Sequence, residues 1–179
     1  MELPRRHRVR HEIPGHARLL TCGTFHRAPI FTMAWAADLF AEHLAHARDA
    51  MDFRLIAWVV MPDHFHLLIV PNVEACSAAD VLRAIKEPVA RGVLARLREM
   101  DHPLVTRLAD ASGTARLWQR GGGHDRNITN RNSAIEAARY IHANPVRKEL
   151  CSRPEDWVWS SARWYAGERS GPVGIDSLR

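Results

Sequence analysis

The sequence has few of the residues that stabilise secreted or membrane proteins. Its three cysteines, Cys22, Cys76 and Cys151, are widely spaced and form no CxxC pattern, which fits a reducing compartment and provides no disulfide framework. The chain also lacks a long uninterrupted apolar stretch and a signal-peptide pattern, so neither a membrane span nor secretion is expected. Its 179 residues suit one cytoplasmic domain with its own hydrophobic core.

Lysine is almost absent, although the chain is strongly basic. It has 23 arginines and only two lysines, Lys86 and Lys148, with a formal net charge of +5 and a pI of about 9.7. This balance predicts a polyanionic partner, and the arginine fork binds phosphate in a bidentate manner and stacks on bases. A genome rich in arginine codons would give the same preference, and the many alanines agree with that. The net charge is therefore the stronger indication.

Charge and composition divide the chain into three parts. Residues 1–14 are predicted to form a basic N-terminal arm that contacts a phosphate backbone through Arg5, Arg6, Arg8 and Arg10. Residues 15–150 carry the patterns of one folded domain, and residues 151–179 form a tryptophan-rich tail that is expected to dock on it.

Hydrophobic periodicity predicts alternating strands and helices. Strands are expected over residues 17–25, 53–62, 64–71 and 115–120. Helices are expected from Thr32, from Ser77 or Ala78 towards Met100 with a kink or break at Pro88, and from Asn132 or Ser133 to the residue before Pro145. The order strand, helix, strand, strand, helix, strand predicts an α+β, ferredoxin-like split βαβ fold, with helices on one face of an antiparallel sheet.

Two histidines stand one residue apart in the apolar run "VVMPDHFHLLIVP". On a strand, His64 and His66 share one face while Phe65 points to the other. Two imidazoles on one face can hold a divalent cation, together with a third ligand from a neighbouring element. The same spacing also describes two polar residues on the solvent side of a strand, so it leaves both interpretations open. Asp63 is either a carboxylate near the metal or a turn residue after Pro62.

The stretch "RYIHANP" places Tyr140 four residues before Asn144, so both project from nearly one side of a helix. A phenolic oxygen is a nucleophile towards phosphorus when a cation polarises the phosphate, and the Asn144 carbonyl can complete the coordination of that cation. An amphipathic core tyrosine with its hydroxyl in water fits the spacing as well. His142 should point away from Tyr140 and is the weaker ligand candidate.

Taken together, these motifs resemble the single-tyrosine HUH transposases, and among them the REP-associated tyrosine transposases. The matching stretches are "AWVVMPDHFHLLIVP", "LWQRGGGHDRNI" and "RYIHANPVRKELCSRPEDWVWSSARWY", in the family's order and over most of residues 15–165. The resemblance implies a fold of the HUH endonuclease type with a metal-dependent site that cuts single-stranded DNA, and hairpin-associated repeats are the expected targets.

The resemblance also implies a role for each site residue. His64, His66 and Asn144 would bind Mg²⁺ or Mn²⁺, and Tyr140 would attack the scissile phosphate to give a 5′-phosphotyrosyl link and a free 3′-hydroxyl. The partner would be single-stranded or hairpin DNA, with the protein acting as a monomer or a homodimer and without a membrane. A domesticated, non-cleaving DNA- or RNA-binding protein and an unrelated phosphoesterase are the alternatives.

Further basic residues are candidates for binding the DNA backbone. Arg139, Arg147 and Lys148 flank the tyrosine helix, and Arg120 precedes the loop "GGGHDRN". That loop is richer in glycine than the family pattern leads us to expect, and the sequence assigns no role to His124 or Asp125 within it.

Overall fold

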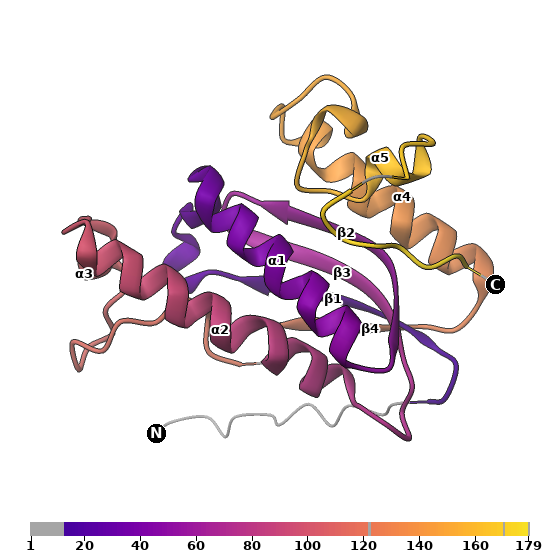
Figure 1. Cartoon of the computed structure of the whole chain (residues 1–179), viewed down its shortest axis with the longest axis horizontal. Coiled ribbons are helices and arrows are strands. Elements are labelled where there is room, and N and C mark those ends of the chain that lie inside the picture. The colour runs from indigo at the N-terminus through magenta and orange to yellow at the C-terminus, as the bar shows by residue number, and fades with distance from the viewer. Residues whose placement is uncertain (1–12, 122, 170, 179) are drawn as a thin grey trace, which may run out of the picture.

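A four-stranded antiparallel sheet forms the centre of the protein in the computed structural model, which describes residues 13–121, 123–169 and 171–178 (Figure 1). The strands are β1 (Ala17–Gly23), β2 (Phe53–Met61), β3 (His64–Pro71) and β4 (His124–Ile128). They lie in the order β2-β3-β1-β4. Because β3 lies between β1 and β2 and is antiparallel to both, this is the split βαβ arrangement, and the predicted ferredoxin-like fold class is confirmed.

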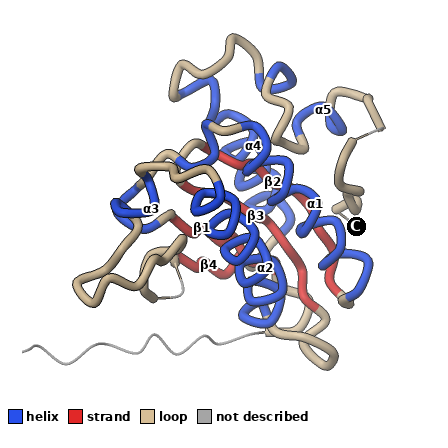
Figure 2. Tube along the Cα trace, turned by 60° about the vertical axis from the view of Figure 1, so that its left-hand side comes forward, coloured by secondary structure: helices blue, strands red, loops and turns tan. Residues whose placement is uncertain are grey.

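Both faces of the sheet are covered by helices. Figure 2 shows α1 (Ala34–Ala50) and α2 (Ala78–Glu99) side by side over one face, where Phe40 packs against Phe65 of β3. The third long helix, α4 (Arg131–Arg147), lies on the opposite face over β2 and β3, where Ile141 joins the second core cluster. The expected placement on one face therefore holds for α1 and α2, whereas α4 covers the other face, because β2 and β3 are apolar on both sides.

The two N-terminal helices begin and continue differently from each other. Helix α2 has the predicted cap, since the Ser77 hydroxyl accepts a hydrogen bond from the Asp80 N–H at 3.1 Å, and it continues through Pro88 without a break. Helix α1 begins after Met33 and not at Thr32. The Thr32 hydroxyl instead donates to the carbonyl of Pro29 at 2.7 Å, so it stabilises the preceding turn.

Helix α4 is longer than expected at both ends. The Asn130 side chain caps it by accepting the N–H of Ser133 at 2.9 Å. At the other end the helix passes through Pro145 and ends at Arg147. Proline removes one helical hydrogen bond but leaves the carbonyl of Asn144 free to accept from Lys148 at 3.1 Å. The additional turn brings two basic residues to the end of the helix.

The fourth strand comes from a segment that the sequence assigned to a loop. Residues 115–120 form only isolated bridges, such as Thr24 with Trp118, and β4 instead begins at His124, directly after Gly123. Gly123 has a φ of +73°, a conformation that glycine adopts easily. A Cβ atom here would overlap the carbonyl oxygen of Thr21 and lie 2.7 Å from the Sγ of Cys22. Only glycine therefore lets the chain approach β1 this closely.

We expect Gly123→Ala to lower the free energy of unfolding by about 3 kcal/mol, from backbone strain plus the overlap with β1. Gly121→Ala is the matched control, because its φ is +86° but nothing lies within 4 Å of its Cβ position; it should cost about 1 kcal/mol. Urea denaturation of both variants measures the difference. Equal losses would show that the close approach of β4 to β1 does not require Gly123.

The C-terminal tail follows the outer edge of β2. The N–H of Val60 donates to the carbonyl of Trp159 at 2.9 Å, and the N–H of Asp176 donates to the carbonyl of Leu55 at 2.8 Å. The Tyr165 hydroxyl, at the end of the short helix α5 (Ala162–Tyr165), donates to the carbonyl of Ile56 at 2.8 Å. Residues far beyond α4 thus satisfy the backbone groups of this edge strand. Within the described ranges, no helix combines the length and apolar character that a membrane span needs.

Candidate active site

The two histidines of β3 lie beneath α4 with their rings close together. Their ring centroids are 4.8 Å apart and the planes are perpendicular, and the residues are only 9% and 4% exposed for His64 and His66. Phe65 points to the opposite face, where it contacts Phe40 and Trp118. The alternation predicted for this strand is therefore present, but the histidine face is covered by a helix and does not face open solvent.

Each imidazole is oriented through its Nδ1 atom. The Nδ1 of His66 lies 2.7 Å from the hydroxyl oxygen of Thr21 on β1, and the Nδ1 of His64 lies 2.6 Å from a carboxylate oxygen of Asp63. Asp63 also pairs with Arg27 at 2.8 Å. A hydrogen-bond partner at Nδ1 fixes the orientation of an imidazole ring and leaves its Nε2 atom available to bind a metal ion. The Nε2 of His66 is buried and has no hydrogen-bond partner among the described residues.

Burial keeps both imidazoles neutral. It lowers the pKa of His66 to about 3, and the nearby His64 and Arg27 act in the same direction. Burial also lowers the pKa of His64, although its hydrogen bond and charge interaction with Asp63 oppose this. A neutral imidazole has a free lone pair, which is the form that binds a metal ion.

Helix α4 places the tyrosine and the asparagine beside the histidines. The rings of Tyr140 and His66 are 5.6 Å apart between centroids, and Tyr140 is 42% exposed. Lys148, two helical turns further on, lies near enough for its charge to lower the pKa of His64. Asn144 is midway between Tyr140 and Lys148 on the same side of the helix, so it projects towards the face of the sheet that carries the histidines, and it is 6% exposed.

The donor atoms that remain suit a divalent cation. The side-chain N–H of Asn144 donates to the carbonyl of Tyr140 at 2.8 Å, which leaves the amide oxygen as the possible ligand. With the Nε2 atoms of His64 and His66 this makes a mixed nitrogen and oxygen set. The described part of the chain contains no group of three His, Cys, Asp or Glu residues arranged for a metal, so any ion here would depend on the asparagine. The unpartnered Nε2 of His66 is the observation that best fits a bound ion.

The predicted DNA-binding residues differ in their surroundings. Arg147 lies over the Tyr140 ring, with its guanidinium carbon 5.4 Å from the centroid, and Lys148 is near His64. Arg139 instead pairs with Glu136 at 2.9 Å, and Arg120 pairs with Asp110 at 3.2 Å. The structure thus brings two of these cations to the site and engages the other two elsewhere. Arg5, Arg6, Arg8 and Arg10 lie outside the described residues.

Asp125, which has no sequence-based role, and His142, the weaker ligand candidate, both have structural partners. Asp125 forms a bidentate ion pair with Arg18, at 2.9 and 2.7 Å, on the α2 side of the sheet. His142 points towards the tail, where its Nε2 lies 2.8 Å from the hydroxyl of Ser161, and burial lowers its pKa to about 4. His142 therefore points towards the tail and away from Tyr140, and its contact links α4 to the tail.

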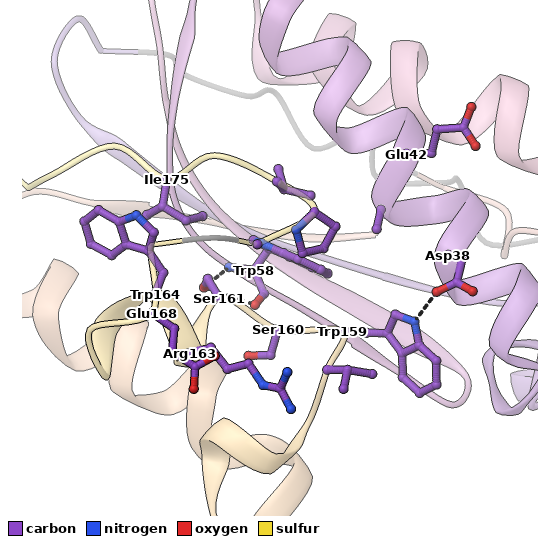
Figure 3. A pocket seen from close by; sticks show the side chains of 15 residues that line it. Asp38, Glu42, Trp58, Trp159, Ser160, Ser161, Arg163, Trp164, Glu168 and Ile175 are labelled. Carbon is purple, nitrogen blue, oxygen red and sulfur yellow. Dashed lines mark hydrogen bonds between the residues drawn. The ribbon is translucent and has the colours of Figure 1, made fainter.

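A cavity of about 310 Å³ lies between α1 and the tail (Figure 3). Trp58, Ser161 and Trp164 line it, and the indole N–H of Trp159 donates to Asp38 at its rim at 2.8 Å. Trp58 belongs to the core on the α1 side of the sheet, whereas the histidines face α4. The cavity is thus separate from the histidine and tyrosine site.

Sequence reasoning missed two residues that orient the histidine pair and its neighbour Asp63. Thr21 contacts His66 of β3 and Arg27 contacts Asp63 in the turn before β3, each more than thirty positions away, and neither has a local pattern that indicates this. Their roles depend on the pairing of β1 with β3 and on the turn that follows β1.

The strand order and the helix packing define a ferredoxin-like α+β protein, and comparison with known proteins gives the family. The sequence model of the IS200-like transposases matches residues 19–144, and the chain belongs to this family. A solved REP-associated tyrosine transposase bound to a REP hairpin is similar over 100% of this chain and 94% of that chain, with 20% identity and a TM-score of 0.64.

A second solved structure, a proposed transposase from Deinococcus radiodurans R1, is 19% identical and has a TM-score of 0.44. The similarity covers 79% of this chain and 95% of that chain. No curated protein matches the chain.

Proposed function

We propose that this protein is a metal-dependent, site-specific endonuclease and strand transferase for single-stranded DNA. The main support is the position of Tyr140, whose half-exposed ring lies beside the buried, neutral His66. A nucleophile needs access to a large substrate, whereas metal-ligating imidazoles need a dry and neutral environment. The packing of α4 on β3 provides both conditions, because it leaves Tyr140 accessible and keeps His66 buried.

The proposed reaction exchanges one phosphoester bond for another. The Tyr140 oxygen attacks phosphorus and loses its proton to solvent, the bond from phosphorus to the 3′-oxygen breaks, and that oxygen takes up a proton. The products are a 5′-phosphotyrosyl link and a free 3′-hydroxyl, and attack by another 3′-hydroxyl reverses the exchange. His64, His66 and Asn144 would hold Mg²⁺ or Mn²⁺, which supplies Lewis-acid polarisation of the phosphate when bound. Arg147, beside the Tyr140 ring, stabilises negative charge on the phenolic and phosphate oxygens.

Covalent adduct formation tests this function directly. The protein is incubated with hairpin oligonucleotides taken from the flanks of its own gene, with Mg²⁺ or Mn²⁺ or with a chelator, and separated under denaturing conditions. We expect a protein–DNA adduct that requires the metal ion. Binding without an adduct under every metal condition would instead support a non-cleaving nucleic-acid-binding protein on the same fold.

The cations of α4 should contribute unequally to DNA affinity. Arg147→Ala and Lys148→Ala should each weaken binding across sequences and reduce the slope of log affinity against log salt by about 1. Arg139→Ala is the matched control on the same helix, because Glu136 already neutralises this charge, and its slope should change much less. Fluorescence anisotropy at several salt concentrations gives the slopes, and an equal effect of all three variants would contradict the assignment.

A further inference from the structure

Strand β4 presents two exposed side chains on the face of the sheet that carries the candidate active site. The pairing register aligns His66 with Thr21 and Thr21 with His124, in one row across β3, β1 and β4. Arg126 occupies the next row on the same face, opposite Leu19. Residues opposite each other in an antiparallel pair point to the same side, so His124 and Arg126 share the side of His66.

On this half of the face Leu19 and Ile128 are buried in the same cluster as residues of α4, but the part around Thr21 and His124 is more open. The helix packs on β2 and β3, whereas on the neighbouring strands Thr21 is partly exposed and His124 and Arg126 are exposed. Thr21 contacts His66, and His66 contacts Tyr140. The partly exposed Thr21 thus lies between the exposed side chains of β4 and the contact of His66 with Tyr140.

The charge of this β4 surface favours an anion. Arg126 forms no ion pair with any residue that the structure describes. The acidic residue beside it, Asp125, points to the opposite face and is bound to Arg18. A guanidinium without a carboxylate partner binds phosphate, and a planar imidazole next to it can stack on an unpaired base.

We infer that His124 and Arg126 form a second DNA contact, which holds the single-stranded segment next to the scissile phosphate. The substrate strand would pass over Tyr140 between Arg147 and Lys148 on one side and β4 on the other. The inference rests on the proposed function and adds the course of the strand over the sheet. Because stacking requires unpaired bases, these residues bind single strands and contribute little to a duplex.

Affinity for two probes separates this role from general attraction to DNA. We compare fluorescently labelled oligothymidine with a blunt duplex, using the Tyr140→Phe form to prevent cleavage. Adding His124→Ala and Arg126→Ala together should weaken oligothymidine binding by about tenfold or more and duplex binding by less than about threefold. Arg54→Ala is the control, since Arg54 is also an exposed strand arginine but lies on β2 opposite Val70, far along the sheet from His66. It should change neither affinity by more than about twofold.

Two additional measurements keep the test decisive if the double variant is unstable. Arg126→Lys should retain most of the oligothymidine affinity that Arg126→Gln loses, and the unfolding transition of each variant shows whether it is folded. Equal losses on both probes, no loss on oligothymidine, or no oligothymidine binding by the parent protein would each overturn the inference. Adduct formation by the protein with Tyr140 intact is measured separately, so a failure at β4 leaves the proposed chemistry standing, and the absence of any adduct refutes that chemistry alone.

Discussion

Tyr140→Phe should abolish the covalent protein–DNA adduct, with a loss of at least about three orders of magnitude in its rate of formation. The substitution removes only the phenolic oxygen, and the ring can retain its contact with His66 at 5.6 Å between centroids. DNA binding should therefore remain close to that of the unchanged protein, while covalent transfer is lost. Time courses of adduct formation with the hairpin oligonucleotides measure the first quantity, and anisotropy measures the second.

Tyr165→Phe is the matched control, because Tyr165 is the second of the two tyrosines in the chain. Its hydroxyl donates to the carbonyl of Ile56, and burial raises the pKa of this phenol. The variant should lose about 1 kcal/mol of stability but keep its rate of adduct formation. An adduct that persists in Tyr140→Phe and disappears in Tyr165→Phe would identify Tyr165 as the nucleophile.

His66→Ala should remove the response of the protein to divalent metal ions. At a metal concentration of about 100 times the dissociation constant, a bound ion stabilises the native state by about 2.7 kcal/mol. The unchanged protein should show this as a higher unfolding temperature in Mn²⁺, and the variant should show no increase. Thermal unfolding with and without Mn²⁺ gives this result without DNA.

Thr21→Val serves as the graded control for the histidine prediction. It removes the hydroxyl that orients the Nδ1 atom of His66 at 2.7 Å but leaves every proposed ligand in place. Loss of a residue that hydrogen-bonds to a metal ligand typically weakens metal binding by about 10- to 100-fold. The stabilisation by Mn²⁺ should therefore need a higher Mn²⁺ concentration to reach its maximum, but it should still occur. A stabilisation by Mn²⁺ that is unchanged in His66→Ala would place the ion elsewhere in the protein.

The parts of the fold that the sequence predicts well are those with strong local patterns. Strands β2 and β3 are continuous apolar runs with a tight turn between them, and they appear within one residue of the expected bounds. Strand β4 has the polar sequence "HDRNI" after glycines, and its local pattern indicates a loop. It becomes a strand through non-local pairing with β1, including the ion pair between Arg18 and Asp125, which are 107 positions apart.

The site shows the same division between local and distant information. The spacings of His64 with His66 and of Tyr140 with Asn144 indicate shared faces, because both members of each pair lie on one element. No spacing indicates that α4 would lie across the histidine face, or that Thr21 and Asp63 would hold the two Nδ1 atoms. The extra turn of α4 beyond Pro145 was also not expected, since proline restricts the residue before it more clearly than those after it.

The tail that follows the outer edge of β2 has a consequence for the behaviour of the chain in solution. An uncovered edge strand is a template for pairing with another polypeptide, and therefore for aggregation. Here the backbone groups of Leu55, Trp58 and Val60 are already bonded to tail residues between Trp159 and Asp176. Any strand that extended the sheet at this edge would first have to displace the tail. The C-terminal segment is thus an intramolecular competitor that protects β2, and its removal would expose a long apolar strand.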